Sequence, residues 1–206
     1  MGAEEYAVLA GRLARWERLP AYTATLYPNN SVQFIPYRPE HDRYGTGACL
    51  HAVERHFTDS SRIALALVSA GTTAEARETV GFCAALLARF LCPPDPDAPA
   101  PAGSPTAGLA ERYASQRDRL RDLAVTMRAL ATGAPYAGAA GGLVAWRESV
   151  VALRDALAAH RTAVRVPEVV DTCVHLFCNR LGVSLPEENY VRYLALRTAA
   201  DLDGRE

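Results

Sequence analysis

From about Ala48 to the end of the chain, apolar residues recur at steps of three and four positions. This spacing places them on one face of an α-helix, and it restricts the possible folds more than any other feature. Asp59, Ser60, Ser61 and Thr73 are residue types that favour helix starts. The predicted helices cover His51 to Phe57, Asp59 to Gly71, Thr73 to Leu91, and residues 107–131, 143–161, 166–181 and 187–200.

The first 37 residues have a different pattern. Residues 1–17 have the periodicity of an amphipathic helix, and residues 22–27 and 31–37 are rich in β-branched and aromatic side chains around Pro28 and Asn29. The latter pattern predicts a β-hairpin. We therefore expect an α+β fold, predominantly helical, in which a small antiparallel sheet packs against a helical C-terminal region. A lone hairpin is only marginally stable, so a partner subunit or a second copy of the chain is expected to complete the sheet.

The 206 residues suffice for a single domain, expected to span 1–206. Within it, residues 93–105 hold six of the thirteen prolines, with Asp, Ala, Gly and Ser between them. Such a segment has no core-forming residues. Residues 93–106 are therefore expected to be a disordered linker inside the domain.

The charge balance argues against some partners. The formal net charge is −1, which gives no electrostatic reason to expect direct binding to nucleic acid or to an anionic membrane. No apolar run long enough to span a bilayer is present, and the acidic start is not followed by a signal-peptide core. A cytoplasmic location is expected.

The five cysteines include no C-x-x-C pair, and a reducing compartment favours small core residues over disulfides. They are Cys49, Cys83, Cys92, Cys173 and Cys178. Neither a metal site nor a cofactor is expected.

Two groups of polar residues are candidates for a functional site. The first comprises Glu40 and Arg43, in a charged segment that follows a predicted strand and precedes a helix. Loops on a rigid scaffold often carry function, but these residue types equally suit an ion pair at a surface turn. Composition alone favours the ion pair.

The second group lies on the helix from Val166, where Asp171, His175 and Asn179 form a polar stripe at steps of four. The opposite face is apolar, with Val170, Cys173, Val174, Phe177, Cys178 and Leu181. A carboxylate one turn from an imidazole can orient it and raise its pKa for acid–base chemistry. The alternative is a surface histidine with a helix-stabilising partner, and the residues alone favour that alternative.

Residues 37–45 (YRPEHDRYG) resemble the Y-x-P-E-x-x-R-Y-G signature of the small C-terminal domain of lantibiotic dehydratases, which also occurs in thiopeptide-type bacteriocin biosynthesis proteins. Residues 52–60 (AVERHFTDS) are similar to the family's A-E-x-x-F-x-x-D-S with a one-residue shift. Residues 175–182 (HLFCNRLG) are similar to its H-M-x-x-N-R-L-G. The resemblance covers roughly residues 1–200.

The resemblance implies antibiotic (RiPP) biosynthesis by a carbon–oxygen lyase. In that domain, glutamate is eliminated from glutamylated Ser or Thr of a precursor peptide, leaving a dehydroamino acid. The motifs make Glu40, Arg43 and His175 the expected catalytic residues, without deciding between Glu40 and His175 as base or acid. They make Tyr37, Tyr44, Asn179 and Arg180 the expected substrate-binding residues.

The sequence departs from the family in lacking the H-x-R-x-R segment of its first strands. The resemblance therefore implies one part of a split enzyme whose missing strands another chain supplies. Two alternatives remain open. One is a thiopeptide enzyme that forms a nitrogen heterocycle by a formal cycloaddition; the other is a non-catalytic subunit that binds a partner enzyme or the precursor peptide.

Overall fold

A computed structural model describes residues 39–93, 107–135, 141–160 and 165–204. The chain divides at Pro39 into two units, 1–39 and 40–206. All the helices described below belong to the second unit.

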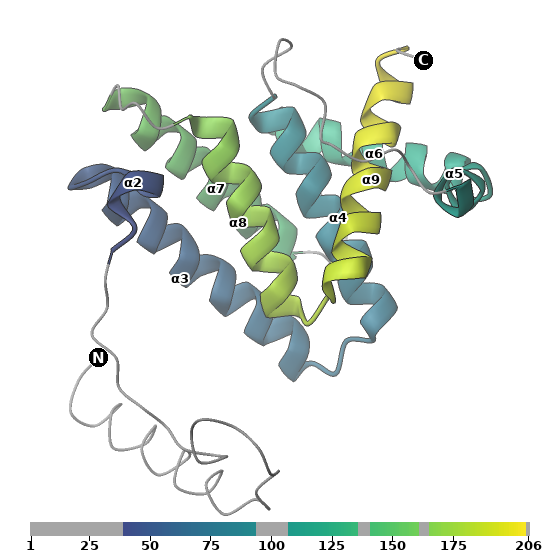
Figure 1. Cartoon of the computed structure of the whole chain (residues 1–206), viewed down its shortest axis with the longest axis horizontal. Coiled ribbons are helices and arrows are strands. Elements are labelled where there is room, and N and C mark those ends of the chain that lie inside the picture. Colours follow the sequence, from purple (N-terminus) through teal and green to yellow (C-terminus); the bar gives the residue numbers. More distant parts are fainter. Residues whose placement is uncertain (1–38, 94–106, 136–140, 161–164, 205–206) are drawn as a thin grey trace, which may run out of the picture. The chain divides into compact units, whose positions relative to one another are not determined.

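This unit is a bundle of α-helices (Figure 1). In chain order the helices are α2 (His41–Tyr44), α3 (Ala48–Ser69), α4 (Ala74–Leu91), α5 (Ala107–Ala114), α6 (Arg117–Ala131), α7 (Gly141–Ala159), α8 (Val166–Leu181) and α9 (Leu185–Leu202). Helix α3 packs against α7 and α8, while α4 packs against α6, α7, α8 and α9. Helices α8 and α9 therefore both pack against α4, but α8 also contacts α3 whereas α9 also contacts α6.

Helix α4 is the centre of the bundle. Its residues from Gly81 to Ala88 are buried without interruption, as expected of a helix that is surrounded on all sides. Gly81 allows the close approach of the neighbours: a Cβ at this position would lie 3.2 Å from the Cys178 sulfur on α8. A larger residue would push α8 away from α4.

A second part of the core lies where α3, α7 and α8 meet. Trp146 of α7 is fully buried, with its ring centroid 5.7 Å from that of Phe177 on α8 and 5.9 Å from that of His56 on α3. The predicted apolar face of α8 is confirmed, because all six of its residues are buried. The five cysteines are confirmed as buried, unpaired core residues.

The predicted α+β class is wrong for the part of the chain that the structure describes, where every regular element is an α-helix and no strand occurs. The two segments expected to form the hairpin, 22–27 and 31–37, lie outside the described residues, as do the first helix and positions 94–106 of the predicted linker. The helices are held by contacts with one another, centred on α4, and not by a sheet on one side.

Most helices lie where the periodicity predicts them, but two boundaries differ. The predicted break near Asp59 does not exist, because α3 runs unbroken from Ala48 to Ser69. The Ser60 and Ser61 hydroxyls donate to the Phe57 carbonyl within the helix, instead of capping a new one. The predicted helix 107–131 is interrupted at residues 115–116, between α5 and α6. The predicted cap is confirmed at Thr73, whose hydroxyl oxygen accepts from the Ala76 amide.

Within the described ranges, no helix is both long and apolar enough to cross a membrane.

Candidate functional site

The connection between α8 and α9 places His175 close to the start of α9. Helix α8 ends at Leu181 and is followed by Gly182, which has a φ of 73°, a conformation that glycine adopts without strain. Helix α9 then begins after Ser184, whose backbone N–H donates to Glu187 at 2.8 Å in a capping box. This short turn brings the first turn of α9 against the second half of α8.

His175 is held there between two side chains. Its Nδ1 lies 2.7 Å from Oε2 of Glu188, and its Nε2 lies 3.2 Å from the side-chain nitrogen of Asn179. Glu188 is almost fully buried, at 2% exposure, whereas the His175 side chain is 40% exposed. The imidazole therefore joins a buried carboxylate on one side to the solvent-accessible surface on the other.

Asp171 does not orient His175, contrary to the prediction from the polar stripe on α8. Its carboxylate instead accepts two hydrogen bonds from Arg192 of α9. Arg192 also donates to Oε1 of Glu188 at 3.3 Å. Burial lowers the pKa of Arg192, but the bonds and charges of Asp171 and Glu188 outweigh it and hold that pKa above its ordinary value. The orienting carboxylate of His175 thus comes from the next helix.

The first candidate group is an exposed ion pair. Arg43 Nη1 lies 3.2 Å from Glu40 Oε2, and both side chains are more than half exposed. The two residues lie at or within the single turn of α2. This geometry agrees with the interpretation that composition alone favours.

Tyr44 and Arg180 lie in a more buried position beside this pair. The Tyr44 ring is buried and packs edge-on against Phe57 of α3, with centroids 5.5 Å apart. Arg180 of α8 places its guanidinium carbon 5.4 Å from the centroid of the same Phe57 ring. Burial lowers the pKa of Arg180 and raises that of Tyr44. Nη1 of Arg180 is buried and has no hydrogen-bond partner within the described residues.

The predicted site residues thus form two groups. In the first group, Tyr44 and Arg180 both contact Phe57, and Arg43 lies over the Tyr44 ring and pairs with Glu40. In the second, His175 and Asn179 lie on the side of α8 that meets α9. No hydrogen bond, ion pair or ring contact in the described ranges joins Glu40 or Arg43 to His175. Tyr37 lies outside the described residues.

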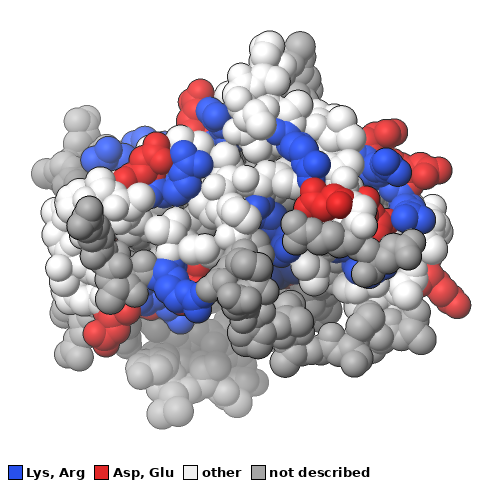
Figure 2. Space-filling model, turned by 90° about the horizontal axis from the view of Figure 1, so that it is seen from above, with Lys and Arg blue, Asp and Glu red and all other residues white. Residues whose placement is uncertain are grey.

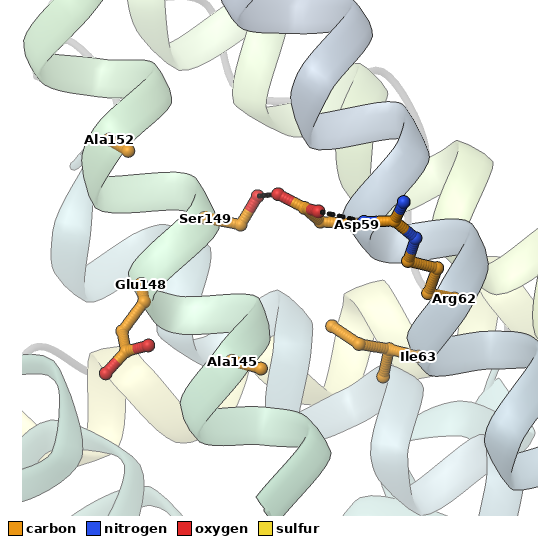
Figure 3. Close-up of a pocket in the computed structure, with 7 residues that line it drawn as sticks. All are labelled: Asp59, Arg62, Ile63, Ala145, Glu148, Ser149 and Ala152. Atoms are coloured by element: carbon orange, nitrogen blue, oxygen red, sulfur yellow. Dashed lines mark hydrogen bonds and ion pairs between the residues drawn. The ribbon is translucent and has the colours of Figure 1, made fainter.

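A groove of about 410 Å³ lies elsewhere, between α3 and α7 (Figure 3). In it the Ser149 hydroxyl points toward Asp59 across the groove, 3.4 Å away, and Asp59 also pairs with Arg62. None of the residues that line this groove is a predicted site residue. The surface view in Figure 2 shows positive and negative side chains interspersed on the face it presents. Because the sequence has no lysine, all the positive side chains are arginines.

Residues 2–199 match the profile of the family described as lantibiotic biosynthesis dehydratase, C-terminal. The chain belongs to this family. Membership connects it with lantibiotic biosynthesis and with the dehydratases that modify peptides in that process, as the motifs in residues 37–45 and 175–182 imply. No curated protein and no solved structure matches the chain.

Glu188 and Arg192 are the polar residues near His175 that the sequence did not reveal. They lie one turn apart on α9, a spacing typical of surface ion pairs, so this spacing by itself does not indicate that Glu188 is buried. A partial signal exists in their neighbours: buried Val191 and Ala195 flank the same face of α9. Only the packing of α9 shows that this face meets His175.

Proposed function

We propose that the chain, as one part of a split enzyme, catalyses β-elimination of glutamate from glutamylated Ser and Thr residues of a ribosomally made precursor peptide. The product is dehydroalanine or dehydrobutyrine. Family membership supports the proposal because conversion of Ser and Thr to these residues is a dehydration. The reaction requires a base for the α-proton, stabilisation of the charge that develops, and a binding site for the glutamyl carboxylate.

The exposure and hydrogen bonding of His175 are the observation that carries the proposal. A half-exposed imidazole hydrogen-bonded to a buried carboxylate is a suitable base, because one ring nitrogen is fixed and the other is close to solvent. Arg180 supports anion binding, since its buried Nη1 has no partner in the described part of the chain. Arg43, whose exposed guanidinium is bound by Glu40, can bind a carboxylate in the same way.

The proposal is tested with a precursor peptide that a separate enzyme has glutamylated. Mass spectrometry then follows the loss of glutamate with time. We expect the wild-type chain to release glutamate, and His175→Ala and Arg43→Ala to leave glutamylated peptide. His160→Ala is the matched control, because His160 is exposed, follows the end of α7, and bonds to the Ala156 carbonyl of that helix. Complete dehydration by both site variants contradicts the proposal.

The separation of the two residue groups favours a second candidate, a non-catalytic module that binds the precursor peptide. Glu40 and Arg43 pair with each other, and neither contacts His175. In this case the wild-type chain binds the peptide, as measured by fluorescence anisotropy of a labelled copy, but releases no glutamate. Incubation with an already dehydrated peptide tests the cycloaddition, which would appear as a macrocyclic product.

A further inference from the structure

Glu188 is a buried acidic residue outside both sequence motifs. At 2% exposure its carboxylate is removed from water, which is costly unless both oxygens are bonded. Both are: Oε2 lies 2.7 Å from Nδ1 of His175, and Oε1 accepts from Arg192 at 3.3 Å. Arg192 is in turn anchored by Asp171. The carboxylate is therefore fixed in place by a cation that is itself held from α8.

These contacts decide which nitrogen of His175 carries the proton. An ionised carboxylate can only accept hydrogen bonds, so Nδ1 of His175 must be the donor to Glu188. The Asn179 side-chain nitrogen, 3.2 Å from Nε2, is a donor, and Nε2 is therefore the acceptor. In a neutral imidazole, these two contacts place the proton on Nδ1 and leave the basic lone pair on Nε2, beside Asn179.

We propose that Glu188 is a positioning residue that fixes His175 in the tautomer required for proton abstraction. This inference rests on the proposed function. In the reaction, the α-C–H of the substrate displaces the Asn179 N–H from Nε2, and Nε2 takes the α-proton. The electron pair of the Cα–H bond forms the Cα=Cβ double bond, and the Cβ–O bond breaks. Glutamate leaves as a carboxylate, and the electron pair of the broken Cβ–O bond stays on its oxygen. Glu188 does not touch the peptide; it stabilises the imidazolium that forms, as the carboxylate of a hydrolase triad does.

The charged groups around His175 in the described residues are Glu188 and, behind it, Arg192 and Asp171. They make Glu188→Gln an informative substitution. Arg192 can only donate hydrogen bonds, so it remains bonded to the oxygen of the new amide. The NH₂ group of that amide then faces Nδ1 of His175. Nδ1 must become an acceptor and the ring proton moves to Nε2, which can no longer take a proton from the substrate.

The first test measures the tautomer directly. In protein labelled with ¹⁵N-histidine, long-range proton–nitrogen NMR spectra distinguish the two tautomers, and the signals of His175 are those lost in His175→Gln. We expect Nδ1–H in the wild-type chain and Nε2–H in Glu188→Gln. Wild-type His175 protonated on Nε2 overturns the inference, and this observation needs no activity. Glu187→Gln is the matched control, because the adjacent Glu187 bonds to the Ser184 backbone and does not contact His175.

The second test uses the elimination assay. We expect Glu188→Gln to lower kcat by about 10² to 10⁴-fold with little change in KM, because Glu188 acts through the base. For the same reason, Glu188→Gln combined with His175→Ala should be no slower than His175→Ala alone. Additive losses in the double variant overturn the inference. Full activity of both His175→Ala and Arg43→Ala refutes the proposed function instead, and the NMR result still decides whether Glu188 sets the tautomer.

Discussion

His56 is a buried histidine whose protonation should make the stability of this protein depend on pH. Its side chain is 1% exposed, and Nδ1 lies 3.0 Å from the Ser149 hydroxyl of α7. Burial and, to a smaller extent, the positive charge of Arg180 lower the pKa of His56 to about 4, while Asp59 acts in the opposite direction. Nε2 has no hydrogen-bond partner within the described residues. The charged form of His56 is thus poorly accommodated in the core.

The size and sign of the effect follow from the two pKa values. Unfolded, His56 has its ordinary pKa of 6.5, whereas in the folded chain the pKa is about 4. Between these values the unfolded state binds more protons, so stability is lost as the pH falls through this window. The full difference corresponds to about 3 kcal/mol, of which about 2 kcal/mol is lost between about pH 7 and about pH 5.

Urea unfolding of the wild-type chain and of His56→Asn, measured across this pH range, isolates the contribution. Asparagine retains a polar group near Ser149 but does not titrate, and its loss of ring packing against Trp146 does not change with pH. We expect the wild-type free energy of unfolding to fall by about 2 kcal/mol more than that of the variant between about pH 7 and about pH 5. His51→Asn, an exposed position on the same helix, should behave like the wild type. Parallel pH profiles for wild type and His56→Asn would refute the reasoning.

Two further variants test the core and the turn that positions the site. Phe177→Ala removes a fully buried ring that packs against Trp146, and it should lower the free energy of unfolding by about 3–5 kcal/mol; a loss below about 1 kcal/mol in urea titrations would contradict the assigned packing. Gly182→Ala places a side chain at a φ of 73° and should cost about 1–2 kcal/mol in the same assay. Gly108→Ala, in open space within α5, should instead be neutral or stabilising by up to about 1 kcal/mol, so equal losses in the two glycine variants would refute the role of the turn.

The helices could be predicted from the sequence because their apolar faces have a period that only a helix satisfies. Helix α8 is the best example, since its predicted range and its six buried apolar residues both agree with the structure. The prediction of a break in α3 was wrong for a physical reason. Ser60 and Ser61 can cap a helix or bond back to a carbonyl inside one, and the burial of Ser60 and Ala64 against neighbouring helices selects the second state.

The site was less predictable because its electrostatics depend on contacts between helices. Spacing within α8 correctly grouped His175 with Asn179, which are hydrogen-bonded, but it also assigned Asp171 as the partner of His175. A carboxylate four residues away on the same helix is a candidate partner in any sequence. The structure shows that Asp171 is bound by Arg192, and that the partner of His175 is Glu188, thirteen residues after His175. No periodicity within a single helix contains that information.

The exposed pair of Glu40 and Arg43 satisfies both interpretations that the sequence left open. An ion pair between solvent-exposed side chains contributes only about 0–1 kcal/mol, because water and salt screen it and two side chains lose freedom. A substrate carboxylate can therefore replace Glu40 on Arg43 at small cost, and such an exchange would free Glu40. The neighbouring Tyr44, by contrast, is buried against Phe57 and cannot move without disturbing α3. The Arg43 guanidinium lies 6.0 Å from the centroid of this fixed ring and keeps that neighbour when Glu40 is displaced, so the surface ion pair is compatible with the proposed substrate-binding role of Arg43.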